Sequence, residues 1–412
     1  MGRIIPLIIV TILSLLIDFY SYKAIVNIYP QWNERKKKTF KWIWWGYTAL
    51  LILGVFGGIF FNLNISLRTV TLVAFFITFV TKIFFILILF IDDIRRFFLF
   101  LIQKVKPEPD KKEQQDGIPR SEFLVKAGIA VAAIPFASLT WGIVSGAYDY
   151  KVKKQTLYFP NLPKEFDGIT LGQISDIHSG SFYNKKAVTG GVEMLLKEKP
   201  DFIFFTGDLV NGRATEMKDY QDIFSKVKAP LGVYSTLGNH DYGTYESWPN
   251  EAVRLKNVED LKKVHQLMGW DLLMNENRRL KVNGAEIGVL GIENWGAGRF
   301  PKFGKMDEAI KNTYDLPVKL LLSHDPSHWR AEVLEKYPSI DASFAGHTHG
   351  AQFGVDTKFL KWSPVQYIYD EWDGLYKQGH QKLYVNVGYG FLGYPGRVGI
   401  LPEITIFELK KG

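Results

Sequence analysis

The stretch DFIFFTGD at residues 201–208 places four apolar residues directly before a polar turn that contains Gly207 and Asp208. A short apolar run that ends in such a turn is typical of a buried strand. Six further runs have the same texture: ITLGQIS (169–175), GVYSTLG (232–238), EIGVLGI (286–292), KLLLSHD (319–325), LYVNVG (383–388) and ITIFEL (404–409). Helical patterns at 185–198 and 251–268 lie between some of them. Residues 155–412 are therefore predicted to form an α/β domain whose helices cover the faces of a sheet.

Histidine, aspartate and asparagine residues gather at the ends of these predicted strands. They are Asp176, His178, Asp208, Asn239, His240, Asp241, His324, His347 and His349. Because strand-end turns of an α/β sheet meet at one rim, where ligands bind, we expect these side chains to form one site. Glycines precede Asp208, Asn239 and His347, and they are expected to permit the backbone angles that aim these side chains into a crowded site.

The side-chain chemistry of this site indicates divalent metals. The chain has no cysteine, which excludes disulfides, iron–sulfur clusters and cysteine nucleophiles. Imidazole, carboxylate and amide ligands without thiolates suit Mn, Fe, Zn or Co. If seven of the nine residues named above are ligands, they are too many for one ordinary ion and fit two ions that share a carboxylate. Such a pair, about 3.5–4 Å apart, clamps the attacking and leaving oxygens of a phosphoryl displacement.

The remaining histidines lack this context. His265 lies in the helical stretch EDLKKVHQLM and His380 in a polar loop, so both are expected to be structural. His328, in HDPSHW, is near the site in sequence and is a candidate substrate contact.

Residues 1–150 have a different composition. Apolar runs at 4–28, 42–61, 69–91 and 128–147 each reach the roughly 20 residues that a spanning helix needs. We predict an all-α transmembrane domain of about four helices before the α/β domain. Asp18 and Lys82 fall inside these runs, where snorkelling or contact with a neighbouring helix is expected ahead of a functional role.

The distribution of basic residues predicts the topology. Residues 1–150 carry 17 Lys and Arg against 10 Asp and Glu, whereas the rest of the chain carries 33 against 32. The basic excess therefore indicates membrane orientation rather than a nucleic-acid partner. The segments 31–41 and 92–122 hold five and seven Lys and Arg, and the segment 62–68 holds one. The N-terminus and, if 128–147 spans, the α/β domain are then expected outside the cytoplasm.

In these strand-end motifs, the sequence resembles the calcineurin-like metallophosphoesterases. The matching pieces are D-I-H (176–178), G-D-L-V-N (207–211), G-N-H-D (238–241), S-H-D (323–325) and G-H-T-H-G (346–350). The resemblance covers roughly residues 155–412, and the tail from Val385 to Leu409 is similar to the membrane-anchored bacterial branch. It implies a four-layer α/β/β/α sandwich with a two-metal centre at one rim.

The resemblance also implies residue roles. Asp176, His178 and His349 would hold the first metal, Asn239, His324 and His347 the second, and Asp208 would bridge the two. His240 would protonate the leaving group, and Asp241 is a candidate to orient it. Asn211, Arg213, Trp295, Arg299 and Arg397 are candidate substrate contacts, because arginine can bind phosphate with two hydrogen bonds. Solvated or packing roles for these five residues remain open.

The leading hypothesis is a multi-pass, membrane-anchored phosphoesterase with two divalent ions, manganese first among them. Its substrate would be a lipid-linked or cell-envelope phosphomonoester, phosphodiester or pyrophosphate. A narrower version resembles enzymes that cleave the pyrophosphate of UDP-2,3-diacylglucosamine, which would require a cytoplasmic catalytic domain. A membrane sensor or transporter-like module with a regulatory phosphoesterase domain is the alternative of another class. A nuclease is disfavoured by the near-neutral α/β domain, and the oligomeric state is open.

Overall fold

The computed structural model describes residues 4–61, 65–105, 120–298, 300 and 302–412. The chain divides into two compact units, Met1–Trp141 and Gly142–Gly412.

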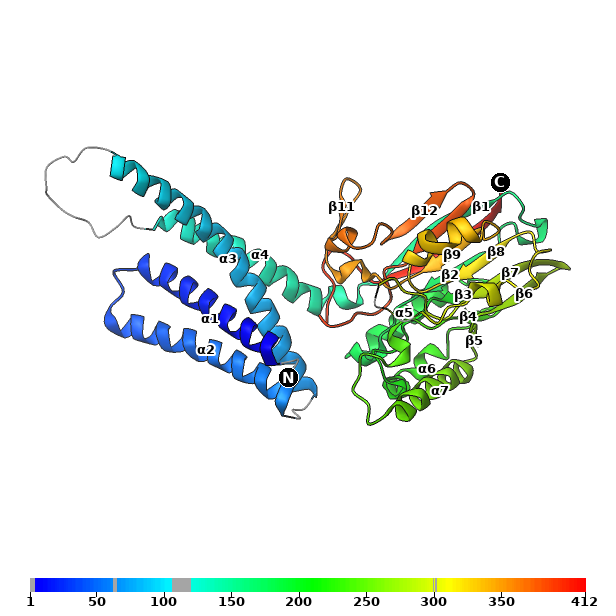
Figure 1. Ribbon diagram of the computed structural model, residues 1–412, viewed down its shortest axis with the longest axis horizontal. Helices are drawn as coiled ribbons and strands as arrows, with labels where there is room; N and C mark the ends of the chain where they lie inside the picture. Colours follow the sequence, from blue (N-terminus) through cyan, green and yellow to red (C-terminus); the bar gives the residue numbers. More distant parts are fainter. Residues whose placement is uncertain (1–3, 62–64, 106–119, 299, 301) are drawn as a thin grey trace. The chain divides into compact units, whose positions relative to one another are not determined.

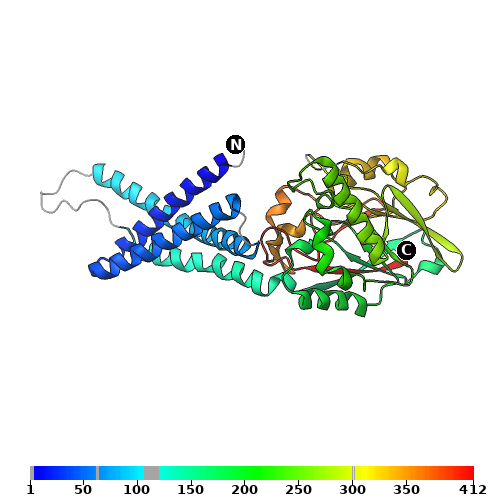
Figure 2. The ribbon, with the colours of Figure 1, turned by 90° about the horizontal axis from the view of Figure 1, so that it is seen from below.

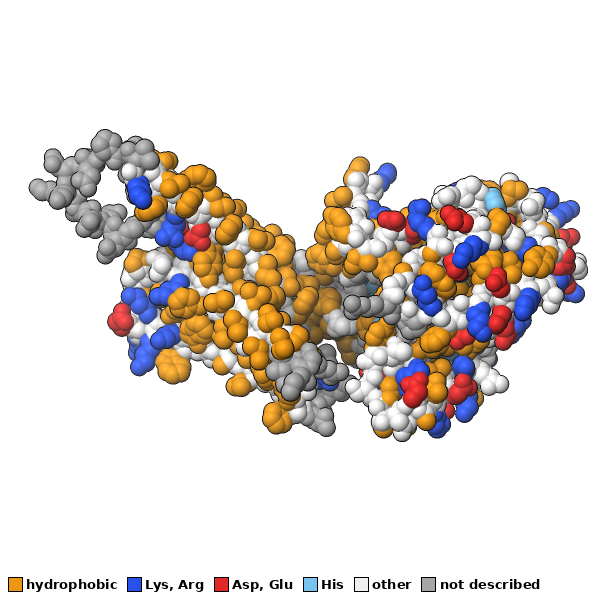
Figure 3. Space-filling model, viewed as in Figure 1, with side chains coloured by type: hydrophobic (Ala, Val, Ile, Leu, Met, Phe, Trp, Pro, Cys, Tyr) orange, Lys and Arg blue, Asp and Glu red, His pale blue; other side chains and the backbone are white. Residues whose placement is uncertain are grey.

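The first unit is built from four apolar helices (Figures 1 and 2). They are α1 (Ile4–Asn27), α2 (Glu34–Phe60), α3 (Ile65–Val105) and α4 (Glu122–Val144), whose last residues belong to the second unit. Each is long and apolar enough to cross a membrane. Large apolar side chains cover much of their outer surface, as Figure 3 shows. The four apolar helices expected from the sequence are therefore present.

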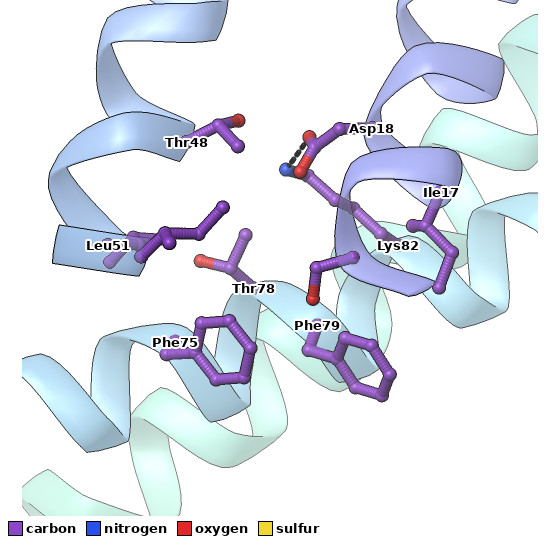
Figure 4. A pocket seen from close by; sticks show the side chains of 10 residues that line it. Ile17, Asp18, Thr48, Leu51, Phe75, Thr78, Phe79 and Lys82 are labelled. Atoms are coloured by element: carbon purple, nitrogen blue, oxygen red, sulfur yellow. Dashed lines mark hydrogen bonds and ion pairs between the residues drawn. The ribbon is translucent and has the colours of Figure 1, made fainter. Parts of the chain in front are cut away.

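Two charges inside these helices form an ion pair. Lys82 of α3 donates to the carboxylate of Asp18 of α1, and the two side chains are only 15% and 5% exposed. A cavity of about 20 Å³ adjoins the pair (Figure 4), with room for about one water. Ser14 and Thr48 line this cavity, and their hydroxyls have no hydrogen-bond partner among the described residues. Contact with a neighbouring helix, rather than snorkelling, thus accounts for both charges.

We predict that Asp18→Asn destabilises the protein far more than neutralisation of a surface pair. Removing one partner leaves the Lys82 charge buried without compensation, which costs about 3–5 kcal/mol. Thermal unfolding of the full-length protein in detergent measures the difference. Glu34→Gln is the matched control, because the Glu34–Lys37 pair is exposed and is expected to contribute about 1 kcal/mol or less. Equal midpoints for the two variants would contradict a structural role for the buried pair.

The second unit contains two six-stranded mixed sheets. The first has the order β1-β14-β2-β3-β4-β5 and the second the order β12-β13-β9-β8-β7-β6. The first sheet comprises β1 (Lys151–Phe159), β14 (Glu403–Lys411), β2 (Thr170–Ile174), β3 (Phe202–Phe205), β4 (Val233–Ser235) and β5 (Asp271–Leu272). The second comprises β12 (Gly374–Gln378), β13 (Gln381–Val385), β9 (Ala342–Ala345), β8 (Lys319–Leu322), β7 (Ala285–Gly291) and β6 (Glu276–Val282). Strands β2 to β5 run parallel to one another, as do β7, β8, β9 and β13.

The two sheets pack face to face through aromatic side chains. The ring of Phe344 on β9 lies 5.2 Å from the rings of Phe204 on β3 and Phe407 on β14, measured between centroids. Helices α5 (Lys185–Lys197), α6 (Gln221–Phe224) and α7 (Glu251–Met268) cover the outer face of the first sheet. In Figure 1, α6 and α7 lie below the strands, and in Figure 2, seen from below, they lie in front. The short helix α8 (Met306–Ala309) and the π-helical turn Trp329–Val333 cover the other sheet. The predicted four-layer α/β/β/α sandwich is confirmed.

Two details differ from the sequence-based expectation. The second unit begins at Gly142 rather than near residue 155, because Tyr150 packs on Tyr389 at 4.4 Å between ring centroids and β1 pairs with β14 along nine residues. Five strands of the two six-stranded sheets, β1, β5, β6, β9 and β12, are not among the seven runs expected from the sequence. β9 is a central strand of only four residues, and the other four lie at sheet edges, where strands are short or carry charged residues and lack a long apolar run.

Candidate metal centre

Parallel strands of both sheets end at the same rim and bring their turns together. Asp176 and His178 follow β2, Asp208 follows β3, and Asn239 follows β4, while His324 follows β8 and His347 and His349 follow β9. Two clusters result, Asp176–His178–His349 and Asp208–His324–His347. Within each cluster the ligand atoms lie within 4.8 Å of one another. Asn239, which is buried beside them, offers an amide oxygen.

The backbone at this rim is held in a strained conformation. Five of the proposed ligands have positive φ values between 48° and 72°, a left-handed region that non-glycine residues rarely occupy. They are Asp176, His178, Asp208, His347 and His349. A Cβ on Gly238 would collide with the Asp208 carboxylate, and one on Gly346 with the Asp176 carboxylate. These two glycines are required by close approach to a ligand, and not by their own backbone angles.

Asp208 lies between the two clusters. Its Oδ2 atom is 3.2 Å from Nε2 of His324 and 3.6 Å from Nε2 of His178. Its Oδ1 atom accepts a hydrogen bond of 2.8 Å from the backbone N–H of His240. One carboxylate therefore faces ligands from both clusters, which is the geometry that a bridging ligand needs.

The residues present fit a pair of divalent ions. Nε2 of His178 and His349, and Oδ1 of Asn239, are buried and have no hydrogen-bond partner among the described residues. Buried polar atoms without a partner are costly, and here they are the donor atoms that a metal ligates. The other ring nitrogen of His324 contacts the carbonyl of Thr206 at 2.7 Å, which fixes the ring's orientation as at many metal sites.

Burial keeps the side chains of most of the histidines neutral. It lowers the pKa of His178 to about 3 and that of His347 to about 4. Burial opposes protonation of His324 too, but the neighbouring carboxylates of Asp208 and Asp176 raise its pKa to about 10. In return, His324 and His240 hold the pKa of Asp208 well below its usual range despite burial. Without metal, Asp208 and His324 thus form a buried ion pair, and a bound metal ion would take the place of the proton.

His240 lies at the edge of this centre. Its Nδ1 lies 2.8 Å from the backbone carbonyl of Asn211 and, since a carbonyl only accepts, this nitrogen carries a proton. The ring packs between His178 and Tyr245, with centroids 5.0 and 4.4 Å away. The phenol of Tyr245 accepts a hydrogen bond from the amide of Asn239.

Asp241 does not orient His240, contrary to the role considered for it. Its carboxylate is buried and accepts hydrogen bonds from four backbone N–H groups. The donors are those of Asp208, Leu209, Val210 and Gly238. Asp241 therefore holds the loop that carries Asp208.

The five residues predicted as candidate substrate contacts have different surroundings in the structure. Asn211 contacts Nδ1 of His178 at 3.1 Å and so lies at the metal centre. Arg213 pairs with Glu246 and stacks on Trp248, and Trp295 stacks on His328 and under Lys302. Arg299 lies outside the described residues.

Arg397 requires a correction. It is 1% exposed, donates to the carbonyls of Val387, Gly388 and Gly390, and lies 3.2 Å from Nδ1 of His349. A buried guanidinium behind a ligand supports the ligand and has no surface to offer a substrate.

The other histidines lie away from the ligand atoms. His265 is buried against Ser235, and His380 contacts the carbonyl of Pro338. His328 is 1% exposed and contacts Ser323, which leaves it no surface for a substrate.

A cavity of about 360 Å³, which was not predicted from the sequence, adjoins the second cluster. It is lined by Ala297, Gly298, Phe300, Ser327, Arg330, Ile368, Tyr369, Asp370 and Glu371. Tyr369 contacts Nε2 of His347 at 2.7 Å, and the Phe300 ring packs on the same imidazole. Asp325, whose carboxylate lies 3.6 Å from Nε2 of His347, could have been noticed as the Asp of S-H-D. The two aromatic residues follow no pattern that marks them.

Comparison with known proteins supports both units. Residues 2–147 match the family model described as "Probable Calcineurin-like phosphoesterase, transmembrane domain", and residues 169–351 match "Calcineurin-like phosphoesterase". A Danio rerio "transmembrane protein with metallophosphoesterase domain" is 29% identical over 66% of this chain, and the match spans 60% of that relative. The Bacillus subtilis metallophosphoesterase YkuE is 28% identical over 71% of this chain and 97% of its own length. Among solved structures, Haemophilus influenzae NAD nucleotidase aligns over 54% of this chain and 45% of its own, with 18% identity and a TM-score of 0.37.

A four-layer sandwich with two adjacent His/Asp clusters at one rim defines a metal-dependent phosphoester hydrolase domain. The two matching family models together cover most of the chain. The chain belongs to the calcineurin-like phosphoesterases, in the branch that carries an N-terminal transmembrane domain, as the motifs indicated.

We predict that His324 stays protonated in the metal-free protein at neutral pH. Its pKa of about 10 lies above the ordinary 6.5, so the stabilising ion pair is complete below pH 6.5 and is lost as the pH rises through 10. In NMR spectra of chelator-treated, 15N-histidine-labelled protein, one imidazole should titrate near pH 10 and be absent in His324→Gln. The resonances of His178 and His347 should remain those of neutral rings down to pH 5. Titration of His324 near 6.5 would contradict the buried pair.

Proposed function

We propose that this protein is a membrane-anchored two-metal phosphoesterase that cleaves a phosphomonoester, phosphodiester or pyrophosphate bond. The observation that carries the proposal is the carboxylate of Asp208, which faces His178 of one cluster and His324 of the other. Two clusters that share one carboxylate suit a pair of ions held close together, which is what phosphoryl transfer by two metals requires.

Manganese is the metal we propose first, with iron, zinc or cobalt compatible. The donor set is imidazole, carboxylate and amide oxygen, without sulfur. When bound, two such ions would supply Lewis-acid activation of a water molecule and neutralise charge on the phosphoryl group.

The chain's own residues then supply proton transfer and positioning. His240 gives a proton to the departing oxygen, and the carbonyl of Asn211 keeps its Nδ1–H in place. Tyr245 packs on the imidazole and accepts from Asn239, so one aromatic residue restrains both the acid and a ligand. The side-chain oxygen of Asn211 restrains the imidazole of His178 through a hydrogen bond to its Nδ1. Asp241 fixes the loop of Asp208 by accepting its backbone N–H.

The part of the substrate that departs would occupy the cavity beside His347. Phe300, Ile368 and Tyr369 give the lining of this cavity an apolar and aromatic part, whereas Arg330 and Glu371, which also line it, form an ion pair. A substrate with an apolar portion, lipid-linked or from the cell envelope, suits such a lining better than a bare sugar phosphate.

We expect the full-length protein in detergent to hydrolyse bis-p-nitrophenyl phosphate with manganese, and chelator to abolish the reaction. Asp208→Asn should lose metal affinity, and His240→Ala should lower kcat by about 100-fold or more with bound metal retained. His380→Ala is the matched control, because this histidine is exposed in a polar loop and its ring contacts the backbone carbonyl of Pro338. If His240→Ala and His380→Ala hydrolyse the substrate equally fast, His240 is not the acid. If the folded protein takes up no metal, the proposed centre itself is wrong.

We also propose that all four helices cross the membrane and that the catalytic domain lies outside the cytoplasm. The alternating counts of Lys and Arg in the connecting segments support this orientation. Because the chain lacks cysteine, Lys411→Cys and Lys36→Cys each introduce a single exposed thiol. An impermeant maleimide should label position 411 in intact cells, and position 36 only after permeabilisation. The opposite pattern would reverse the orientation and would suit a cytoplasmic enzyme of the UDP-2,3-diacylglucosamine pyrophosphatase type.

A further inference from the structure

A short β-ribbon of the catalytic unit exposes apolar side chains at its tip. Strands β10 (Val355–Asp356) and β11 (Lys361–Trp362) pair antiparallel. The turn between them is ordered, because the hydroxyl of Thr357 accepts hydrogen bonds from the N–H groups of Phe359 and Leu360. Phe359 is nevertheless 95% exposed and Leu360 55%. Figure 3 shows apolar side chains and a basic one gathered over this ribbon.

The apolar surface continues from the ribbon to the metal centre. Trp362 donates to the hydroxyl of Tyr367 at 3.4 Å, and Tyr367 and Ile368 are 76% and 78% exposed. Ile368 also lines the cavity described above, together with Tyr369, which contacts the ligand His347. An exposed apolar strip thus leads from the tip of the ribbon into the cavity beside the second cluster.

Hydrogen bonds connect the root of the ribbon to Gly142, which belongs to the same unit and lies at the end of a candidate spanning helix. The backbone N–H of Gly354 donates to the carbonyl of Val398. The backbone N–H of the neighbouring Arg397 donates to the carbonyl of Gly142 at 3.2 Å. The site where a Cβ of Gly142 would stand is 2.7 Å from the Val398 side chain. Gly142 lies in the last turn of α4, one of the helices apolar enough to cross a membrane. The chain therefore enters the catalytic unit next to the ribbon.

We propose that the segment 355–368 is a bilayer-docking element of the catalytic unit. Phe359 and Leu360 enter the interfacial region, and Trp362 and Tyr367 lie at headgroup level, where amphipathic rings are favoured. Lys358, exposed at the tip, pairs with lipid phosphates. The mouth of the cavity then opens at the membrane surface, where an amphiphilic phosphoester enters from the bilayer. This inference rests on the proposed function and narrows its substrate to amphiphiles.

Site-specific labelling tests whether the tip enters lipid. In the cysteine-free chain, Phe359→Cys carries a single NBD fluorophore, and the full-length protein is reconstituted in phosphatidylcholine–phosphatidylglycerol vesicles. Lipids with a nitroxide near the headgroup should quench NBD at position 359 at least about twofold more than at the control position Tyr314→Cys. Tyr314 is also an exposed aromatic residue, at 77%, but precedes β8 at the opposite end from its metal ligand. Equal quenching at the two positions overturns the proposal. Shielding of position 359 from aqueous iodide without lipid quenching also overturns it, in favour of a protein partner or a second copy.

The ratio of two rates tests the consequence for substrate access. Phe359→Ser combined with Leu360→Ser should lower turnover of a dialkyl phosphodiester embedded in vesicles, relative to turnover of soluble bis-p-nitrophenyl phosphate, by about tenfold. Tyr314→Ser should leave this ratio unchanged. An unchanged ratio in the double variant, whatever the absolute rates, overturns the inference. If the unsubstituted chain hydrolyses neither substrate, the proposed function fails instead, and the quenching experiment still decides whether the segment docks.

Discussion

The position of the Asp208 carboxylate is the constraint on which the rest of the catalytic unit depends. It must reach His178 at the end of one sheet and His324 at the end of the other. This is possible only where the two sheets pack closely and their parallel strands end at a common rim. The aromatic contact between Phe204 and Phe344 holds β3 and β9 together just below that rim. The apolar core thereby sets the spacing on which the metal chemistry depends.

This arrangement is costly, and the cost is offset locally. Left-handed backbone at five proposed ligands and three unpartnered ligand atoms both oppose folding of the metal-free chain. Asp241 offsets part of the cost, because its carboxylate accepts four backbone N–H groups of the Asp208 and Gly238 turns. Arg397 supports the turn after β9 from behind. Metal binding would stabilise the same atoms, so we expect folding and metal occupancy to be linked.

The sequence predicted the elements that carry a long-range physical requirement. Central strands such as β3 must be apolar on both faces, and ligands such as Asp208 must follow them directly, so both could be recognised. The edge strands β1 and β6 have no such requirement, and because they contain charged residues they lack the apolar run that indicates a strand. The sequence suggested that Asp241 orients His240 and that Arg397 contacts the substrate, because their residue types allow these roles. Only the fold shows that backbone groups of the ligand loops occupy them.

Chemistry and specificity lie on different parts of this fold. The ligands follow central strands, whose positions the core fixes, so the catalytic constellation has little freedom to vary. Phe300, Ile368 and Tyr369, which shape the cavity, lie on connections after β7 and β11, outside regular strands. Connections tolerate substitution and insertion far better than core strands. Because Tyr369 contacts His347, a change in these connections would alter both the shape of the cavity and the restraint on one proposed ligand. In the proposed function, substrate preference would therefore be coupled to the metal centre through one hydrogen bond, although the two are built from separate elements.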